Sequence, residues 1–238
     1  DVPGYWVPYW LHPYQLIKGT KWKSCKPEGL TSTSIKDMYQ NVYHEFIGDV
    51  LYVQINDNYN TEERNIRNYL KGVTSQMREK QPKDVVFDLR FNPGGNNYHL
   101  PWPFIRSLND YLTNDKKCWI ITGNGTFSAG IITAAYAKYT LGEKAVIVGE
   151  KVGDRMQFWA DGGTKMTLPN SKISPRIWTA FNDWENGCRD IRKCFRFAYF
   201  DSFPAGDLNM DKELPLSFFD YINGDDTVLK SIFSNQYL

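Results

Sequence analysis

The chain has 238 residues, of which 42% are hydrophobic and 23% are charged, so it contains enough apolar material for a large buried core. Its 28 lysines and arginines against 27 aspartates and glutamates give a net charge of +1, which provides no broad field for nucleic acid or an anionic membrane and disfavours both partners. No apolar run approaches the ~20 residues that span a bilayer, so we expect no membrane insertion. The chain opens with Asp-Val-Pro-Gly rather than methionine, and we expect a mature or trimmed fragment.

The chain is expected to consist of an N-terminal arm and one large domain. The first residues are rich in proline and aromatic side chains and keep no sustained period, so residues 1–49 are predicted to be irregular. This arm could equally be the remnant of a larger N-terminal region. Residues 50–238 show no internal repeat, linker or low-complexity segment, and we expect them to fold as a single domain.

Periodicity predicts a strand, a helix and a second strand at the start of this domain. Residues 50–55 have the β-branched and aromatic content of a strand. A helix is expected to begin at Asn60, because Asn60 and Glu63 resemble a capping box, and to end before Pro82. Residues 85–89 form a nearly continuous apolar run, which is typical of a buried parallel strand. The buried stripe of the helix is predicted to consist of Ile66, Leu70, Val73 and Met77.

The same alternation of strands and helices continues along the chain. Strands and helices at this spacing favour parallel crossover connections, and therefore an α/β fold with a mostly parallel sheet. Later residues give only short strand-like pieces, at 165–168 and 173–177, and a last helix at 228–233. The elements expected between these two parts are a helix at 103–112, a strand at 118–122, a helix at 128–139 and a strand at 145–148.

The four cysteines show no zinc-binding spacing, because no CxxC pair occurs and the three histidines are dispersed. We therefore expect no metal site. Cys188 and Cys194 bracket a short polar loop and could close a small disulfide if the chain matures in an oxidising compartment. The alternative is a pair of ordinary thiols. Cys118 is expected to be a buried strand residue.

Two glycine-containing turns each follow a buried strand and precede a helix, which places backbone amides at the carboxyl edge of the sheet, where ligand sites gather. In the second turn, Ser128 falls at the start of an alanine-rich helix, where its hydroxyl could act as a nucleophile. The alternative is an ordinary N-cap serine. In the first turn, Gly94 and Gly95 allow the backbone to approach a substrate carbonyl. An amide there, together with the amide of Ala129, would form a two-donor oxyanion hole.

Three motifs occur in one order: Asp88-Leu-Arg-Phe-Asn-Pro-Gly-Gly, Gly125-Thr-Phe-Ser-Ala and Val148-Gly-Glu. In this order and spacing they resemble the C-terminal-processing (tail-specific) serine proteases, over residues 50–177. The resemblance implies a crotonase/ClpP-like spiral of strands and helices, a nucleophile at Ser128 and oxyanion amides from Gly95 and Ala129. The later part of the chain looks more like a secreted bacterial branch of that family, and the family's PDZ insertion has no counterpart here.

The general base departs from the family pattern. In the family it is a lysine after the glutamate of the Val-Gly-Glu motif, and that position here holds Arg155. Arginine stays charged at any useful pH and cannot accept the Ser128 proton. Lys151, four residues earlier, could take the role instead. A second branch of the family uses a distant histidine with acidic support, which makes His99 and His44 candidates for the base as well.

These features together predict a secreted or periplasmic serine hydrolase that acts on a peptide or protein substrate through an acyl-enzyme at Ser128 and needs no cofactor. Gly94, Asp154 and Arg155 are expected to bind the substrate. Asp154 and Arg155 would hold a peptide terminus, and the alternative for these two residues is an ordinary loop ion pair. Two rival functions remain open. One is a noncatalytic peptide- or ligand-binding protein on the same fold, which the arginine at position 155 favours, and the other is an acyl-CoA enzyme of the crotonase type.

Overall fold

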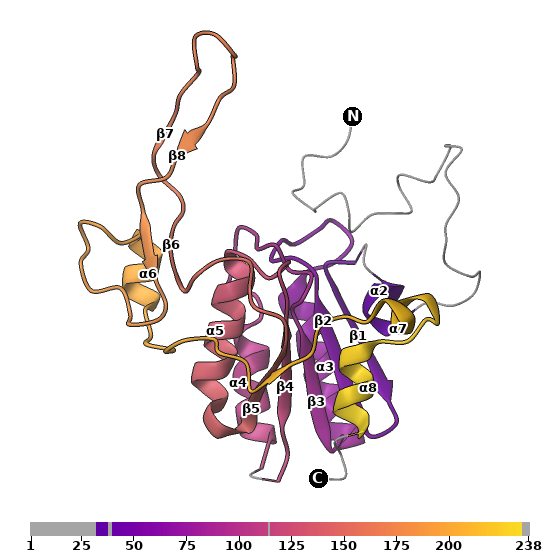
Figure 1. Cartoon of the computed structure of the whole chain (residues 1–238). Coiled ribbons are helices and arrows are strands. Elements are labelled where there is room, and N and C mark those ends of the chain that lie inside the picture. Colours follow the sequence, from indigo (N-terminus) through magenta and orange to yellow (C-terminus); the bar gives the residue numbers. More distant parts are fainter. Residues whose placement is uncertain (1–31, 38–39, 114, 235–238) are drawn as a thin grey trace.

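The computed structural model describes residues 32–37, 40–113 and 115–234, and its centre is a six-stranded sheet in the order β1-β2-β3-β4-β5-β10 (Figure 1). β1 pairs antiparallel with β2, and all the other neighbours in the sheet are parallel. The predicted α/β fold with a mostly parallel sheet is therefore confirmed. The strands are β1 (Val42–Ile47), β2 (Val50–Ile55), β3 (Asp84–Asp88), β4 (Cys118–Thr122), β5 (Ala145–Gly149) and β10 (Lys212–Glu213).

Helices cover both faces of this sheet. On one face lie α3 (Ile66–Lys80), α4 (Trp102–Tyr111) and α5 (Ala129–Leu141), whose apolar side chains share the main core with alternate residues of the strands. On the other face lies α8 (Thr227–Ser234), which packs on the intervening strand residues. Because successive strand side chains point to opposite faces, strands buried on both sides read as continuous apolar runs. The sequence prediction of β3 used this property.

The start of α3 differs from the prediction. The helix begins at Ile66, and its N-cap is Asn65, whose side chain accepts a hydrogen bond from the backbone N–H of Asn68 at 3.0 Å. Asn60, the predicted cap, instead accepts from the N–H of Ile66 at 2.9 Å, across the loop that leads into the helix. The four predicted stripe residues are all buried, and the helix ends at Lys80, before Pro82.

The N-terminal arm expected at 1–49 lies largely outside the described residues. Its described part contains the short helix α2 (Thr33–Lys36) and the edge strand β1, which pairs along its whole length with β2. Residues 42–47 are thus part of the sheet, although the sequence analysis assigned them to the irregular arm. The boundary between arm and domain stays a prediction.

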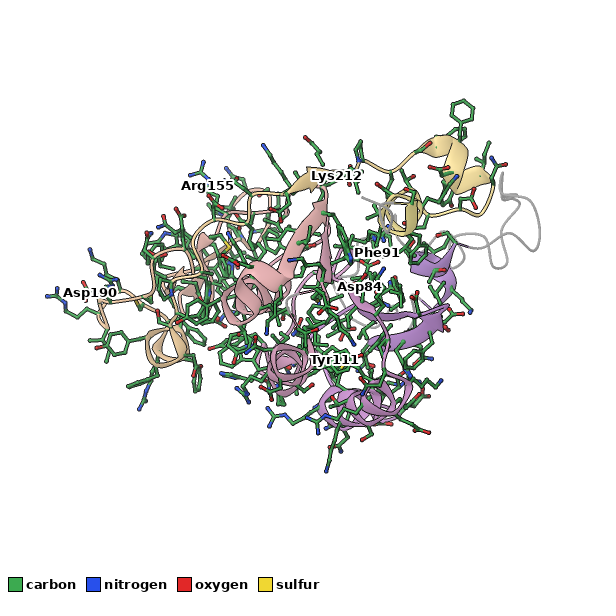
Figure 2. The ribbon with its side chains drawn as sticks, turned by 90° about the horizontal axis from the view of Figure 1, so that it is seen from below. Asp84, Phe91, Tyr111, Arg155, Asp190 and Lys212 are labelled. Atoms are coloured by element: carbon green, nitrogen blue, oxygen red, sulfur yellow. A yellow bond between two sulfur atoms is a disulfide. The ribbon has the colours of Figure 1, made fainter. Side chains whose placement is uncertain are left out.

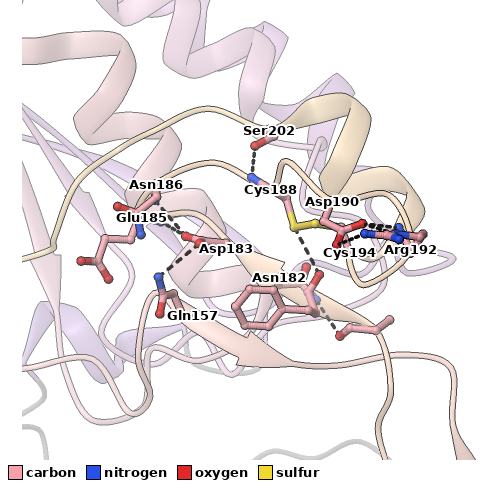
Figure 3. The surroundings of a disulfide bond; sticks show 12 residues. Gln157, Asn182, Asp183, Glu185, Asn186, Cys188, Asp190, Arg192, Cys194 and Ser202 are labelled. Atoms are coloured by element: carbon pink, nitrogen blue, oxygen red, sulfur yellow. Dashed lines mark hydrogen bonds and ion pairs between the residues drawn. A yellow bond between two sulfur atoms is a disulfide. The ribbon is translucent and has the colours of Figure 1, made fainter.

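A projecting segment, defined here as residues 157–206, extends from the sheet beyond β5 (Figure 1). Its base is anchored by Trp184, which is fully buried against Ala129, Ile132 and neighbouring side chains at the start of α5. The predicted disulfide between Cys188 and Cys194 is present, with a Cα–Cα distance of 6.0 Å (Figure 3). The elements of this segment are β6 (Gln157–Trp159), β7 (Thr164–Lys165), β8 (Arg176–Ile177), β9 (Phe181–Asp183) and α6 (Arg196–Asp201).

The remaining elements are short. The 3₁₀ turn η2 (Gly142–Lys144) links α5 to β5, and α7 (Phe218–Ile222) precedes α8. Within the described part of the chain, no helix is long and apolar enough to cross a bilayer. The crotonase/ClpP-like spiral implied by the family resemblance stays a prediction, since the sheet order and helix layers describe an α/β fold in general.

Candidate active site

The two predicted turns meet at one edge of the sheet because they follow the neighbouring parallel strands β3 and β4. The contact between them is close. A Cβ atom added to Gly94 would lie 2.8 Å from the Cβ of Ser128 and 3.0 Å from the backbone nitrogen of Ala129. Gly94 also has a φ of +112°, which side chains with a Cβ rarely adopt. Only glycine therefore fits this position, and the structure brings Gly94, Ser128 and Ala129 together as the sequence predicted.

Ser128 has an unusual backbone. It lies between β4 and α5 with φ 49° and ψ −121°, a conformation that costs a non-glycine residue about 1–3 kcal/mol. Ser128 occupies the N-cap position of α5, but its half-buried side chain makes no capping hydrogen bond to the helix. Within the described residues its hydroxyl has no hydrogen-bond partner at all. A strained strand-to-helix turn with a free hydroxyl is the geometry of a nucleophile elbow.

The backbone amides predicted to form the oxyanion hole are both free of acceptors in the part of the chain that the structure describes. The N–H groups of Gly95 and Ala129 make no hydrogen bond there. The N–H of Gly94, in contrast, donates to Oδ1 of Asn92 at 2.9 Å. Two available donors on either side of the Gly94–Ser128 contact are what an oxyanion hole requires. Their role in catalysis stays a prediction.

A buried network of amide side chains, which the sequence analysis missed, holds the first turn in place. Asn58 donates its backbone N–H to the carbonyl of Gly94 at 2.7 Å, and its Oδ1 accepts from Nδ2 of Asn92 at 2.9 Å. Its Nδ2 donates to the Oγ1 of Thr133, inside α5, at 3.2 Å. Asn58, Asn92 and Thr133 are all fully buried. The only sequence signal was the polar stretch at 56–60, with three asparagines, which we interpreted as a polar break.

The second turn is fixed on three sides. Oγ1 of Thr126 donates to the carbonyl of Leu89 at the end of β3, at 2.8 Å. The N–H of Phe127 donates to the carbonyl of Asn92 at 2.9 Å, and the N–H of Gly153 donates to the carbonyl of Thr126 at 2.9 Å. The position of Ser128 is thus determined by the first turn, by β3 and by the segment after β5, and not by its own helix alone.

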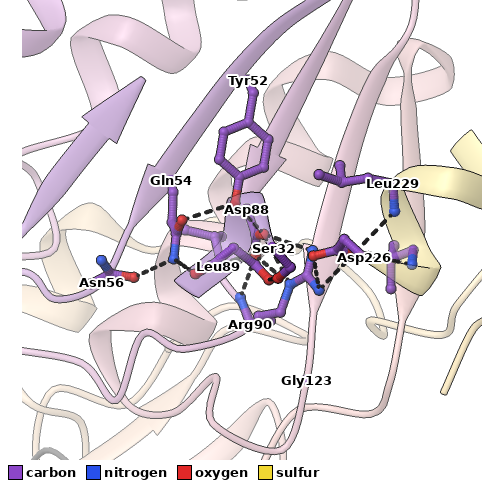
Figure 4. Close-up of polar contacts among 12 residues, drawn as sticks. Ser32, Tyr52, Gln54, Asn56, Asp88, Leu89, Arg90, Gly123, Asp226 and Leu229 are labelled. Carbon is purple, nitrogen blue, oxygen red and sulfur yellow. Dashed lines mark hydrogen bonds and ion pairs between the residues drawn. The ribbon is translucent and has the colours of Figure 1, made fainter. Parts of the chain in front are cut away.

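Below the first turn lies a buried ionic cluster (Figure 4). The guanidinium of Arg90 lies 2.8 Å from a carboxylate oxygen of Asp88 and 3.0 Å from one of Asp226, the residue before α8. Burial disfavours the charged guanidinium, but the two carboxylates outweigh this effect and raise the pKa of Arg90. Tyr52 donates its hydroxyl to Asp88 at 2.7 Å. The cluster ties the Asp88-Leu-Arg motif to the helix on the opposite face of the sheet, and we assign it a structural role.

His99 is paired with an acid. Its Nε2 lies 2.7 Å from Oδ2 of Asp201 at the end of α6, and the side chain is one-third exposed. Tyr98 donates its hydroxyl to the same oxygen at 2.8 Å, and burial followed by the hydrogen bond to Asp201 raises the pKa of Tyr98, so this donor stays protonated. Nδ1 of His99 has no partner among the described residues. Asp201 is 102 residues away along the chain, and no sequence signal identified it.

His44 is held elsewhere. Its Nδ1 lies 2.7 Å from the hydroxyl of Tyr69 and its Nε2 lies 3.3 Å from Oε1 of Gln76, both on α3. It belongs to β1, three strands from β4 in the sheet order, which is about 14 Å at the usual strand spacing. The structure therefore does not bring His44 to Ser128.

The three charged candidates after β5 are all exposed. Lys151 has no ion-pair partner among the described residues, and neither has the guanidinium of Arg155, which lies at the outer surface (Figure 2). Asp154 accepts a hydrogen bond from the backbone N–H of Arg155 at 2.8 Å and does not pair with its guanidinium. The alternative of a loop ion pair between these two residues is therefore wrong. Because Thr122 pairs with Gly149, the segment starts beside the end of β4.

A cavity of about 230 Å³ lies behind the second turn, on the side of α8. Its walls are largely apolar, and Ser128 is not among the residues that line it. Among the described residues, no three His, Cys, Asp or Glu side chains gather closely enough to hold a metal ion. The lining includes Phe91, Gly123, Gly125, Glu150, Leu214 and Val228.

Comparison with protein-family models gives no match, and no curated protein sequence matches the chain. Among solved structures, it is similar to a lipoprotein from Streptococcus agalactiae, with 15% identity, a TM-score of 0.41 and coverage of 73% of this chain and 65% of that one. The photosystem II D1 C-terminal processing protease has 14% identity and a TM-score of 0.39, with coverage of 74% of this chain and 48% of that one. Mature CPAF complexed with lactacystin has 10% identity and a TM-score of 0.46, with coverage of 93% of this chain and 60% of that one. The chain thus spans less than two thirds of each structure, and likenesses at this level carry no conclusion about its activity.

Proposed function

We propose that the chain is a serine hydrolase that acts on peptides, with Ser128 as its nucleophile. The observation that carries this proposal is the backbone of Ser128, which is held at a positive φ at a strand-to-helix turn although its side chain caps nothing. A residue that costs stability and forms no compensating bond is best explained by chemistry. The resemblance of the three motifs to the tail-specific proteases supports a peptide as the substrate.

In the proposed reaction, Oγ of Ser128 attacks the carbonyl carbon of the scissile peptide bond while its proton passes to Nδ1 of His99, directly or through one water. Asp201 holds the opposite ring nitrogen and stabilises the imidazolium that forms. The N–H groups of Gly95 and Ala129 donate to the developing oxyanion. The C–N bond then breaks, and His99 returns the proton to the leaving amine. Water, activated by the same histidine, attacks the acyl-enzyme and releases the new carboxylate.

His99 is our first choice of base because it alone among the candidates is hydrogen bonded to a carboxylate, and because it follows the glycine turn by only four residues. Lys151 is the second choice, since it lies on the segment that contacts the second turn. The exposed guanidinium of Arg155 has no ion-pair partner among the described residues and is suited to bind a peptide carboxylate.

A fluorophosphonate probe tests the proposal on the folded full chain. Mass spectrometry is expected to find the label on Ser128, and Ser128→Ala should abolish it. His99→Gln should slow labelling by about 10²–10⁴-fold, whereas His44→Gln and Lys151→Met should leave the rate unchanged. A loss in Lys151→Met alone would assign the base to Lys151.

A noncatalytic peptide-binding protein is the second candidate, because the lysine position of the family holds Arg155. It predicts an unlabelled Ser128, together with peptide binding that Arg155→Gln weakens and Ser128→Ala does not. Titration of a C-terminally free peptide and of its amidated form separates this candidate from the hydrolase.

The disulfide supports an extracytoplasmic location, since such bonds persist in oxidising compartments. We therefore propose that the chain is secreted or periplasmic. We also keep the proposed division into an arm at 1–49, whose strand β1 joins the sheet, and a hydrolase domain at 50–238.

A further inference from the structure

The tip of the projecting segment is a hairpin with two chemically different faces. β7 and β8 pair Thr164 with Ile177 and Lys165 with Arg176. The ladder continues beyond the two strands, because the N–H of Met166 donates to the carbonyl of Pro175 at 3.0 Å and that of Leu168 to Ile173 at 2.9 Å. The register is therefore constant along the hairpin, which Figure 1 shows extending away from the sheet.

This register determines which side chains lie on the same face of the hairpin. Since directly paired residues share a face and successive residues alternate, one face carries only Thr164 and apolar side chains. The opposite face carries two cations, Lys165 and Arg176, and a hydroxyl pair, Thr167 and Ser174, whose Oγ atoms lie 3.0 Å apart. The apolar face consists of Met166, Leu168, Ile173, Pro175 and Ile177.

No described part of the chain covers the apolar face. Met166, Leu168, Ile173 and Ile177 are 46%, 40%, 63% and 55% exposed. Trp178, on the cationic face, is also exposed, and the guanidinium of Arg176 lies 4.6 Å from its ring centre. Single exposed apolar residues are ordinary, but several on one face of one hairpin mark an interaction surface.

The charges on the hairpin identify the partner. Between Thr164 and Trp178 the sequence has three cations, Lys165, Lys172 and Arg176, and no acidic residue. Apolar side chains on one face and cations on the other suit a hairpin that lies within the headgroup layer of an anionic lipid surface. The apolar side chains enter the boundary of the acyl chains, and the long cationic side chains contact the surrounding headgroups. Two copies of the hairpin, in contrast, would repel each other.

We propose that the 164–177 hairpin docks the protein onto the surface of an anionic lipid bilayer. The hairpin lies in the headgroup region with its apolar face inward, and the sheet with its catalytic turns stays in water. The docking does not depend on the hydrolase proposal, since none of the residues that it uses belongs to the candidate active site.

The test is flotation of the full chain with vesicles of phosphatidylcholine that contain about a third of phosphatidylglycerol, against phosphatidylcholine alone. We expect binding to the anionic vesicles. Replacing Lys165, Lys172 and Arg176 together by glutamine should weaken it about a hundredfold, because each cation near an anionic surface raises the affinity about fivefold. Leu168→Ser with Ile173→Ser should weaken it about tenfold or more.

Matched controls remove the same groups elsewhere. Lys71→Gln, Arg78→Gln and Lys83→Gln change the net charge equally, and Phe218→Ser with Phe219→Ser removes two exposed aromatic side chains of α7. Both controls should bind as the unchanged chain does. Absence of vesicle binding, or an equal loss in the charge control, overturns the proposal. So does a dimer in sedimentation velocity that the Leu168/Ile173 variant dissolves, because the partner is then a second copy.

Discussion

The central sheet and the projecting segment keep their shapes by different means. β2 and β3 are buried along their whole length, and their neighbours bond to them on both edges. The projecting segment has strands of two or three residues, and a disulfide compensates for its small core. The candidate site joins the two regions, because Ser128 and its glycine turn belong to the sheet and Asp201 belongs to the projecting segment. The proposed nucleophile is thus held by the sheet, and the carboxylate that supports the proposed base His99 is held by the disulfide-bonded segment.

The largest effect is expected from the buried ionic cluster of the sheet. Arg90→Met leaves the carboxylates of Asp88 and Asp226 buried without their partner, which should lower the free energy of unfolding by about 3–5 kcal/mol. Urea unfolding measures this. Arg192→Met removes an exposed ion pair of the projecting segment and should leave the midpoint unchanged. An equal fall in the free energy of unfolding of the two variants would contradict the view that the sheet and the projecting segment are stabilised differently.

A smaller loss of stability, with a large loss of activity, is expected for Asn58→Ala. The side chain of Asn92 would lose its acceptor and Thr133 its donor, at a cost of about 1–3 kcal/mol. Probe labelling of Ser128 should slow more than the stability loss explains, because the glycine turn keeps the backbone bond of residue 58 to Gly94 but loses the side-chain network that holds Asn92. As the control, Asn65→Ala removes the N-cap of α3, costs about 1 kcal/mol and should leave labelling intact. Equal labelling by both variants would contradict the positioning role of Asn58.

Removing the disulfide should affect one region alone. In the chain-entropy account, Cys188→Ala with Cys194→Ala costs about 2 kcal/mol for so short a loop. Hydrogen exchange is expected to rise across the projecting segment and to stay slow in β2 to β5. Labelling of Ser128 should fall partly, since Asp201 follows this loop. Faster exchange in the sheet as well would show that the two regions unfold as one unit.

The smallest effect is a pH dependence that comes from the sheet. Cys118 is fully buried, and burial followed by the charge of Asp84 raises the pKa of its thiol well above the ordinary value of 9.0. The folded state therefore keeps a proton that the unfolded state loses, so stability falls as pH rises above about 9, by up to about 1.4 kcal/mol per pH unit. Unfolding of the chain and of Cys118→Ala between pH 8 and pH 10 should show a steeper fall in stability with the thiol present, above the smaller slope that buried tyrosines such as Tyr98 give to both proteins. Identical slopes would refute the assignment.

The sheet was largely predictable from sequence, and the projecting segment only in part, through its disulfide and two strand-like pieces. A continuous apolar run identified β3, β-branched and aromatic content identified β2, and an apolar stripe identified α3, because burial on a sheet or helix face leaves a pattern in the sequence. Strands as short as β6, β9 and β10 cannot be recognised from sequence, because two or three residues are too few to show a hydrophobic periodicity. Edge strand β1 was missed for a related reason, as its side chains are mostly half-buried and mixed in polarity.

The candidate site was predictable only where its residues are local in sequence. The glycine turn and Ser128 follow strands, so topology alone brings them together. Asp201 reaches His99 through the fold of a distant segment, and Asn58 acts through buried hydrogen bonds that have no sequence pattern. Both arms of the hairpin were predicted as strand-like pieces, at 165–168 and 173–177. Its surface was missed, because the net charge averages over the whole chain and hides three cations within fifteen positions that lack any acid.

The strained backbone of Ser128 lowers the stability of the folded chain, and the residue type at this position therefore affects stability as well as the proposed activity. A glycine at this position would adopt a φ of 49° without strain, and the hydroxyl that it removes is bonded to nothing among the described residues. Ser128→Gly is therefore expected to unfold at a higher temperature than the natural chain. Selection for stability alone would favour glycine here, so the retained serine is consistent with the proposed role of Ser128 as a nucleophile.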